Sequence, residues 1–475
     1  MTLHHITIIG GGISGLSTAY YVQQEAQKRG LDLAYTLLEQ ADRWGGKIWT
    51  ETIEGYGDEP FVVERGPDAV LTQKPWALQL ARELGIGEEF LPTNDDRRKT
   101  FVLNKGKPTP LPDGVMLIVP TQIKPFALSS LISPWGKLRM GLEWFIPAKT
   151  DDEDETLAQF ITRRLGAEAL DKIAEPLMSG IYNAEANMQS VLATFPRFRD
   201  IEKQHGSLIK GMLAAKKARP ASSNGQSNGR SPAMFTSFKN GMEALVTALC
   251  AQLTGDCRLE TAVQAITPGA ARNYQVHLAD GPSLDTDAVV LAVPAFAAAE
   301  LLADIAPDSA QELRQIRYVS TGTVSLAFRR EDVAHPLNGF GIVIPSSEKR
   351  RINAITWSST KFNHRAPAGH VLLRVFFGGS RTPQMMALDD EELLKTVRTE
   401  LADIMGLTTE PLFHLIHRWF DANAQYDVGH LERIAAVEAA LPDGMYVTGS
   451  PYRGVGVPDC VKQGLETAVR VVANR

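Results

Sequence analysis

The segment at residues 6–15, which reads ITIIGGGISG, constrains the fold of this chain most strongly. Its apolar residues predict a buried strand, and Gly10, Gly12 and Gly15 then follow the spacing G-x-G-x-x-G, with a helix expected from Leu16 to Ala26. In such a motif the first glycine allows a sharp turn, the second lets the backbone approach a pyrophosphate, and the third lets helix and strand pack closely. The segment therefore predicts a β-α-β unit that binds a dinucleotide.

A second strand, Ala34–Leu38, strengthens this prediction because it ends in Glu39. A carboxylate at this distance from the glycine motif is placed to bind ribose hydroxyls. The next segment carries Arg43 and then Gly45-Gly46-Lys47. We expect these glycines to give close backbone access and the arginine to bring a cation near the phosphates, which a domain for nicotinamide alone does not need.

Composition limits the class of protein and its compartment. The 475 residues predict about three domains, and the net charge of −6 without a basic stripe argues against nucleic acid as the main partner. The cysteines are Cys250, Cys257 and Cys460, and no C-x-x-C pair occurs. The sequence therefore indicates neither a disulfide framework nor a metal site, and it fits a reducing, cytoplasmic compartment.

Membrane signals are weak in the sequence. The first strand is expected at about His5, which leaves no room for a signal peptide, and no run of about 18 uncharged apolar residues predicts a transmembrane helix. Three shorter apolar segments are Gly114–Ile123, Pro125–Gly136 and Leu142–Ile146. We expect them to pack in the core, and peripheral contact with a membrane surface or an internal ligand tunnel are the alternatives.

The order of predicted elements indicates a fold that is α/β in one part and α+β in another. Strand patterns near residues 258–295 and at MYVTGS resemble the first strand, whereas residues 320–420 read as a mixed or antiparallel sheet with a helix at Asp389–Met405. Residues 121–215 read as mostly helical, with an acidic run at Asp151–Glu155 that we interpret as a solvated helix start. Residues 219–232, rich in Ser, Asn and Gly, predict a flexible loop.

We therefore predict a discontinuous Rossmann-type nucleotide-binding domain, a mixed-sheet substrate domain and a mostly helical subdomain. The expected boundaries are residues 1–70, 233–300 and 430–475 for the first; 71–95, 205–232 and 301–429 for the second; and 96–204 for the third.

The C-terminal segment GSPYRGVGVPDC, residues 449–460, leads into a helix that we expect from about Val461. Backbone N–H groups at such a helix start can face a ring that becomes anionic on reduction.

Several motifs together resemble the porphyrinogen oxidases, a branch of the flavin amine oxidase superfamily. They are GGGISGL, E-x(3)-R-x-GGK, ERGPD, EPLMSGIY, WFDANAQYDVGH and SPYRGVGVPDC, and they cover nearly the whole chain. The first two are shared with amine oxidases and phytoene desaturases. EPLMSGIY and the C-terminal pair resemble more specifically the soluble bacterial enzymes that oxidise coproporphyrinogen III.

The resemblance implies non-covalent FAD and oxidation of a porphyrinogen in heme biosynthesis, with oxygen as acceptor and hydrogen peroxide as product. It implies no catalytic side chain, since the flavin nitrogen N5 takes the hydride. The implied cofactor-binding residues are Gly10, Gly11, Gly12, Ile13, Ser14, Gly15, Glu39, Arg43, Gly46, Lys47, Gly66, Pro67, Asp68, Val263, Ser450, Val455, Gly456 and Val457.

The substrate carries propionates, so cations in an apolar cleft are required. We expect Lys74 and Arg98 to supply charge and Gly180, Ile181 and Tyr182 to shape the cleft; a surface role for Lys74 and plain helix termination at SGIY are the alternatives. Membrane-bound protoporphyrinogen oxidases carry an arginine where this chain has Thr100. Coproporphyrinogen III is therefore the preferred substrate, and protoporphyrinogen IX is the alternative.

Three further hypotheses about the function and partners of the chain stay open at this point. An amine oxidase or carotenoid desaturase would not oxidise coproporphyrinogen. A non-catalytic escort protein with this fold would be colourless and would not take up FAD. A transient contact with a ferrochelatase is a hypothesis that the sequence does not test.

Overall fold

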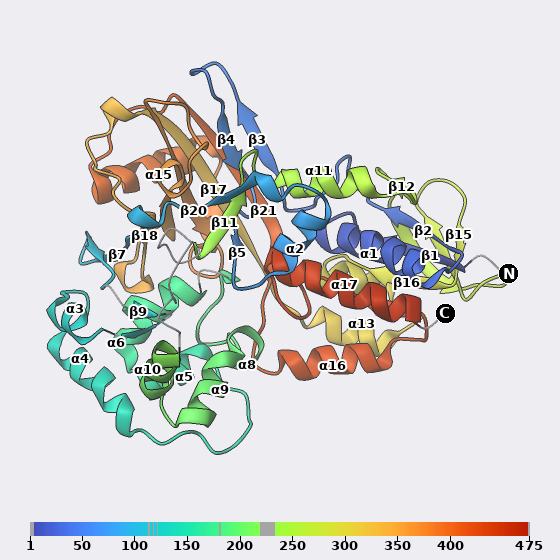
Figure 1. The fold of residues 1–475 in the computed structure, drawn as a ribbon, viewed down its shortest axis with the longest axis horizontal. Coiled ribbons are helices and arrows are strands. Elements are labelled where there is room, and N and C mark those ends of the chain that lie inside the picture. The colour runs from blue at the N-terminus through green and yellow to red at the C-terminus, as the bar shows by residue number, and fades with distance from the viewer. Residues whose placement is uncertain are drawn as a thin grey trace, which may run out of the picture.

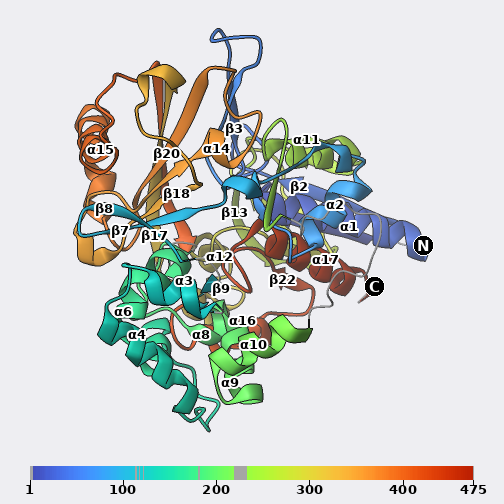
Figure 2. The same ribbon diagram turned by 60° about the vertical axis from the view of Figure 1, so that its left-hand side comes forward.

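The structure, a computed structural model, describes residues 4–112, 115–116, 118–120, 122–179, 182–218 and 233–473. Its parts lie around a common centre (Figure 1): a parallel sheet with helices on the right, a second sheet at the upper left, and a group of short helices at the lower left. The view turned by 60° keeps these groups apart (Figure 2). The predicted loop at residues 219–232 lies outside the described residues.

The nucleotide-type sheet is parallel and is assembled from three separated stretches of chain. Its order is β12-β2-β1-β16-β22, so β1 lies at the centre between β2 and β16. The strands are β1 (His4–Ile9), β2 (Leu33–Leu38), β12 (Asp256–Arg258), β16 (Ala288–Leu291) and β22 (Met445–Val447). The discontinuous Rossmann-type fold is thereby confirmed, while the exact domain boundaries stay a prediction.

Helices cover both faces of this sheet because its central strand is buried on both sides. Ile6 and Ile8 pack with one group of helices, and Ile9 packs with another. The first group is α1 (Ile13–Arg29), α2 (Trp76–Glu83), α11 (Glu243–Gln252) and α17 (Val457–Ala473), and the second is α12 (Ala295–Leu301), α13 (Pro307–Arg314) and α16 (His430–Ala440). The predicted start of the last helix near Val461 was wrong, since α17 already begins at Val457.

The second sheet is mixed and has the order β21-β17-β20-β19-β18-β7-β8. Helix α15 (Asp390–Met405) packs against it through Leu393, Val397 and Leu401, as the sequence predicts. The strands are β7 (Thr100–Asn104), β8 (Lys107–Pro110), β17 (Tyr318–Arg329), β18 (Gly341–Val343), β19 (Ala354–Trp357), β20 (His370–Gly378) and β21 (Phe413–Ala424). β7 and β8, which we grouped with the helical subdomain, therefore pair within this sheet.

Smaller strand groups connect these parts. They are β3 (Thr50–Ile53) with β4 (Phe61–Glu64); β5 (Val70–Leu71), β11 (Phe235–Phe238) and β6 (Phe90–Pro92); β9 (Val115–Met116) with β10 (Val119–Pro120); and β13 (Val263–Pro268), β14 (Tyr274–Leu278) and β15 (Leu284–Thr286). Short helical turns are η1 (Gly87–Glu89), η2 (Asp95–Arg97), η5 (Arg330–Asp332), η6 (Ser346–Glu348), η7 (Pro383–Ala387) and α14 (Ser358–Lys361).

The helical subdomain is built from short helices because prolines and glycines interrupt its sequence. They are α3 (Ile123–Leu128), α4 (Pro134–Gly141), η3 (Leu142–Phe145), α5 (Leu157–Arg164), α6 (Ala167–Ala169), η4 (Leu170–Ser179), α8 (Val191–Thr194), α9 (Pro196–His205) and α10 (Leu208–Ala218). Thr156 forms a capping box with Gln159 at the start of α5, which fixes that helix where the sequence predicts it.

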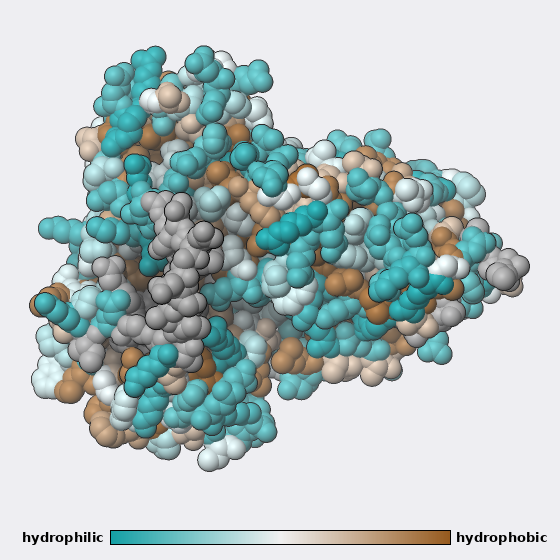
Figure 3. Space-filling model, viewed as in Figure 1, coloured by the Kyte–Doolittle hydropathy of each residue, from teal (hydrophilic) through white to brown (hydrophobic). Residues whose placement is uncertain are grey.

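Apolar side chains of this subdomain are more exposed than we expected. Trp135 and Phe145 expose about four-fifths of their surface, at 81% and 79%. Phe126, Leu131, Ile132 and Met140 point into the core instead. The prediction that these segments pack wholly as core was therefore wrong, because one layer of short helices has only one inner face. Hydrophobic surface is visible along the lower left edge, near α3 and α4 (Figure 3).

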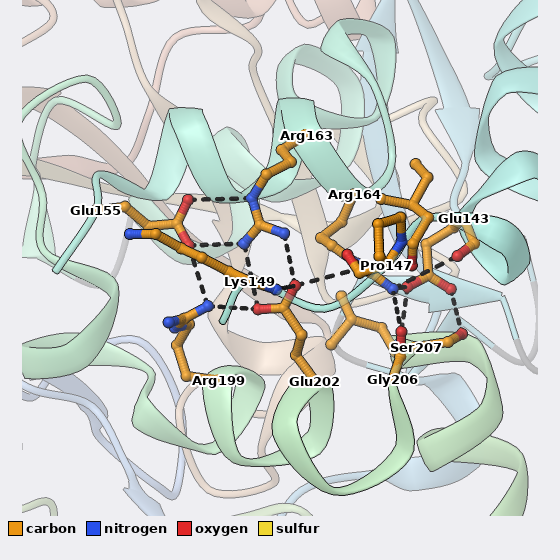
Figure 4. Close-up of polar contacts among 12 residues, drawn as sticks. Glu143, Pro147, Lys149, Glu155, Arg163, Arg164, Arg199, Glu202, Gly206 and Ser207 are labelled. Carbon is orange, nitrogen blue, oxygen red and sulfur yellow. Dashed lines mark hydrogen bonds and ion pairs between the residues drawn. The ribbon is translucent and has the colours of Figure 1, made fainter. Parts of the chain in front are cut away.

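Buried charges hold the inner side of the same subdomain together (Figure 4). Arg163 pairs with Glu155 at 2.7 Å and with Glu202 at 2.5 Å, and Arg199 pairs with Glu202 at 2.6 Å. Our interpretation of the whole acidic run as solvated was wrong at Glu155, which is buried because two arginines approach it. Asp151 and Asp152 are exposed, as predicted.

The second half of this network fixes η3. The Glu143 carboxylate, fully buried, accepts hydrogen bonds from the Arg164 guanidinium, from the Ser207 hydroxyl at 2.6 Å and from the Leu208 N–H at 2.8 Å. Arg164 also donates to the Ile146 carbonyl at 2.9 Å. Glu143 therefore ties the turn that carries Trp144 and Phe145 to α5 and α10.

Replacing Glu143 with alanine would remove the nearer carboxylate partner of the buried Arg164 guanidinium and leave only Glu202, at 3.4 Å. We expect Glu143→Ala to lower the free energy of unfolding by about 3–5 kcal/mol, as for other broken buried pairs. Glu153→Ala, at an exposed position on the same subdomain, is the control and should change it by less than about 0.5 kcal/mol. Urea unfolding measures both, and equal stabilities would contradict the role assigned to Glu143.

Candidate functional site

The glycine motif forms a tight turn between β1 and α1. Gly10 has a φ of +109°, and a Cβ on Gly15 would lie 1.8 Å from the Gly10 carbonyl oxygen, so neither position accepts a side chain. Gly12 differs, because it has an extended backbone and a Cβ there would meet no atom within 4 Å. The open side of Gly12, at the N-terminus of α1, is where a pyrophosphate can approach the backbone.

Glu39 lies at the end of β2, beside this turn. Its carboxylate accepts hydrogen bonds from the Gly11 N–H at 2.7 Å and from the Ala41 N–H at 2.9 Å. The Thr261 N–H donates to the Glu39 carbonyl at 2.8 Å, which brings the start of β13 at Val263 to the same edge of the sheet. The structure thus brings the predicted ribose carboxylate close to Val263, another of the predicted cofactor-binding residues.

The second glycine loop packs against the first. The Gly45 N–H donates to the Gly11 carbonyl at 2.8 Å, and a Cβ on Gly46 would lie 3.2 Å from the Gly12 Cα atom. The Arg43 guanidinium donates to the carbonyls of Gly46 at 2.7 Å and Ile48 at 2.5 Å, so it fixes its own loop. That the charge of Arg43 also acts on the phosphates stays a prediction.

Lys47 is enclosed at the same place. Its ammonium donates to the Ala422 carbonyl on β21, and burial lowers its pKa from the ordinary value. A Cβ on Gly66 would lie 1.7 Å from the Lys47 carbonyl oxygen, so only glycine allows these segments to touch. The predicted cofactor-binding residues Lys47 and Gly66 are therefore neighbours.

Two cations, one on the second sheet and one on α14, hold the segment that contains Gly66, Pro67 and Asp68. Arg374 on β20 donates to the Gly66 carbonyl at 2.7 Å, and Lys361 pairs with Asp68 at 2.8 Å. Burial by itself would raise the pKa of Asp68, but Lys361 and Arg374 hold it below the usual range. Asp68 is therefore a carboxylate that ties the segment between β4 and β5 to α14.

Glu64, two residues before Gly66, completes this buried group. Burial raises its pKa to about 7, although Arg365 and two hydrogen-bond donors oppose the shift. Those donors are the Met242 N–H and the Thr50 hydroxyl, both at 2.8 Å. A cavity of about 10 Å³, large enough for about one water, lies between Glu64, Asp68 and Arg374.

The C-terminal turn reaches the nucleotide motif from the other side. A Cβ on Gly449 would lie 2.9 Å from the Ser14 hydroxyl oxygen of α1. The turn continues through Ser450 and Val455, and Gly456 then precedes the first residue of α17, Val457. The earlier start of α17 places these residues at the N-terminus of a 17-residue helix, as required for backbone N–H groups that face a ring.

The predicted substrate residues have different surroundings. Lys74 pairs with Asp459 at 2.6 Å, beside the C-terminal turn, and Arg98 is exposed just before β7. Tyr182 is buried and contacts Tyr426, with ring centroids 5.7 Å apart. Gly180 and Ile181 lie outside the described residues. The assignment of all five to substrate stays a prediction.

Sequence reasoning missed Arg374, Lys361, Tyr426 and His430 as parts of this site. Arg374 comes from β20 and Lys361 from α14, and no local pattern predicts that they reach Gly66 and Asp68. Tyr426 and His430 stand in the quoted motif YDVGH, so a signal was present although it carried no role. Their contacts join the turn at Ser450 to the rest of the fold.

The site as a whole fits a dinucleotide. An open glycine edge lies at a helix N-terminus, a carboxylate ends the neighbouring strand, and two more glycine segments meet beside them. This arrangement, with a separate mixed sheet beyond it, defines a dinucleotide-dependent oxidoreductase.

The chain belongs to the flavin containing amine oxidoreductase family, whose model matches residues 13–472. Its cofactor is FAD. It is 35% identical to the coproporphyrinogen III oxidase of Bacillus subtilis over 97% of this chain and 96% of that one. It is 32% identical to the enzyme of the same name from Staphylococcus aureus, over 98% and 99%. A putative protoporphyrinogen oxidase from Exiguobacterium has the same fold, with a TM-score of 0.86, 32% identity and 100% coverage of both chains.

Two glycine substitutions separate nucleotide binding from folding. We expect Gly12→Ala to leave the stability of the FAD-free protein unchanged, because its Cβ meets open space, but to weaken FAD binding at least tenfold, because the Cβ enters the pyrophosphate approach. Gly15→Ala should instead destabilise the fold, because its Cβ would collide with the Gly10 carbonyl. Fluorescence titration with FAD and thermal unfolding measure the two effects. An unchanged FAD affinity in Gly12→Ala would contradict the prediction that a pyrophosphate approaches the backbone at Gly12.

Proposed function

We propose that this chain oxidises coproporphyrinogen III to coproporphyrin III. The observation that carries the proposal is the identity of 35% with a coproporphyrinogen III oxidase across nearly the full length of both proteins. FAD, when bound, supplies the hydride acceptor. The substrate loses six electrons in three such steps, and molecular oxygen takes two electrons and two protons each time to give hydrogen peroxide.

The residues of the chain support this chemistry by positioning. A cation left on a porphyrinogen bridge carbon is stabilised by its two flanking pyrroles, so the step depends on geometry more than on a strong base. We expect backbone N–H groups at the start of α17 to face the flavin, and Arg374 and Lys361 fix the segment Gly66–Asp68. We assign no catalytic side chain, in keeping with this requirement.

Protoporphyrinogen IX is the second candidate substrate, because the family includes enzymes named for it. Four propionates on coproporphyrinogen III need more cations than the two on protoporphyrinogen IX, and Lys74 and Arg98 are the proposed contributors. A transient contact with a ferrochelatase that takes up the porphyrin stays a prediction.

Anaerobic mixing of the FAD-bound protein with each porphyrinogen tests the substrate. We expect coproporphyrinogen III to bleach the flavin absorbance at about 450 nm rapidly and protoporphyrinogen IX to do so at least tenfold more slowly. On admission of air, porphyrin fluorescence should rise with three hydrogen peroxide molecules per porphyrin. Faster bleaching by protoporphyrinogen IX would reverse the choice. No bleaching by either would exclude a porphyrinogen oxidase.

We also propose that the exposed apolar residues of the helical subdomain contact an anionic membrane surface. This apolar surface consists of Leu128, Trp135, Leu138, Leu142, Trp144 and Phe145. Among the helices that the structure describes, none is long and apolar enough to span a bilayer. A protein with this surface would therefore rest at the lipid boundary.

The charged residues near this apolar surface indicate which type of membrane it contacts. Residues 122–149 contain one acid, Glu143, which is buried in its ion pair, and four cations. Lys149 pairs with Asp151 at 2.9 Å, which leaves the charges of Lys124, Lys137 and Arg139. The Lys210 ammonium lies over the Trp144 ring at 5.2 Å. This local excess of positive charge, in a chain with a net charge of −6, favours anionic lipid headgroups and disfavours pairing with a second copy of the same surface.

Sedimentation with vesicles tests the contact. We expect the protein to bind vesicles that contain phosphatidylglycerol several-fold more strongly than vesicles of phosphatidylcholine alone, and the preference to weaken at high salt. The double variant Trp135→Ser/Phe145→Ser should lose most of this binding. Phe420→Ser, which removes an exposed ring on β21, is the matched control and should bind normally. Equal binding of all three proteins would reject the proposed contact.

A further inference from the structure

Tyr426 spans the C-terminal turn from inside the protein. Its side chain is buried, and its hydroxyl donates to the Ser450 carbonyl at 2.7 Å while it accepts a hydrogen bond from the Gly454 N–H at 2.8 Å. Burial raises the pKa of Tyr426 well above its ordinary value, so the hydroxyl keeps its proton. One oxygen atom thus fixes both ends of the segment Ser450–Gly454.

His430 supports this contact from behind. Its ring stacks on the Tyr426 ring, with centroids 3.9 Å apart and an angle of 13° between the planes. Its Nε2 atom donates to the Tyr452 carbonyl at 2.9 Å, in the middle of the same turn. Burial lowers the pKa of His430 to about 4, so the imidazole is neutral near pH 7. The two rings therefore hold the turn at three alternate residues, Ser450, Tyr452 and Gly454.

The segment that carries both rings is fixed by other parts of the molecule. The Ser190 N–H of the helical subdomain donates to the Tyr426 carbonyl at 2.8 Å. Arg317 makes two hydrogen bonds to the Asp427 carboxylate, at 2.7 and 2.9 Å. The Asp154 carboxylate accepts from the Ser190 hydroxyl at 2.6 Å and from the Gly429 N–H at 3.4 Å. The segment that carries Tyr426 is therefore fixed by contacts with the helical subdomain and with Arg317.

The turn that Tyr426 holds lies beside the predicted nucleotide-binding turn at Gly10–Gly15. Gly449 lies against Ser14 of α1, and the turn leads directly into the N-terminus of α17. A displacement of Ser450 or Gly454 would therefore move backbone groups that face FAD. A tyrosine hydroxyl lost at this place would also leave the Gly454 N–H buried without its acceptor.

We propose that Tyr426 is a positioning residue for the flavin, which acts by setting the turn Ser450–Gly454, with His430 keeping its ring in place. The inference rests on FAD binding by this chain and does not depend on which porphyrinogen is oxidised.

The variant Tyr426→Phe tests the proposal, since it removes only the hydroxyl. We expect FAD to bind about tenfold more weakly, and the visible circular dichroism and reduction potential of the bound flavin to shift. Tyr35→Phe is the matched control. Tyr35 is also a buried tyrosine, and its hydroxyl likewise bridges an oxygen, Gln23 Oε1 at 2.9 Å, and an N–H, that of Gly255 at 3.1 Å. It should lose stability without any change in the flavin.

The readouts separate positioning from general stability. A Tyr426→Phe protein whose FAD affinity, dichroism and potential match those of Tyr35→Phe would overturn the proposal. If Tyr426→Phe fails to fold, His430→Gln keeps the hydroxyl and should still change the dichroism and potential, though less; an unchanged flavin there would also overturn it. All measurements are made without porphyrinogen, so an error in the substrate assignment does not affect them.

Discussion

The close approach of backbone segments at glycines is the constraint on which the rest of this structure depends. Gly15 touches Gly10, Gly66 touches Lys47, and the loop at Gly45 and Gly46 lies on Gly11 and Gly12. A Cβ at Gly15 or Gly66 would come within 2 Å of a carbonyl oxygen. Backbone N–H groups can surround a pyrophosphate here only because the side chains are missing, so the glycines define the nucleotide site before any charged residue acts.

Charged contacts then join parts of the chain that are distant in sequence. Arg374 on β20 and Lys361 on α14 bind the segment Gly66–Asp68, and Arg317, just before β17, pairs with Asp427. A charge as buried as that of Arg374 is costly unless its donors are paired, so such a contact specifies one arrangement of the parts more than it adds stability. The same principle explains the helical subdomain, where Glu143 and Glu202 hold the inner side while apolar rings remain outside.

Elements that depend on local patterns were predictable. The turn at Gly10–Gly15, the strands at Tyr274–Leu278 and Ala288–Leu291, and the helix α15 follow from glycine spacing and hydrophobic periodicity. Predictions failed where the burial of a side chain depends on residues that are distant in sequence. Glu155 is buried only because Arg163 and Arg199 approach it, and Trp135 is exposed only because nothing in the described part of the chain covers α4.

The sequence by itself determined the nucleotide fold and the family resemblance, and it predicted which residues surround FAD, because glycine spacing and a terminal carboxylate are local requirements of a pyrophosphate and a ribose. Only the tertiary structure decided how those residues are held. Tyr426 meets Ser450 and Gly454, and Arg374 meets Gly66, through contacts between segments 24 to 308 residues apart. Such contacts depend on how the sheets and helices pack, and no pattern along the chain records that packing.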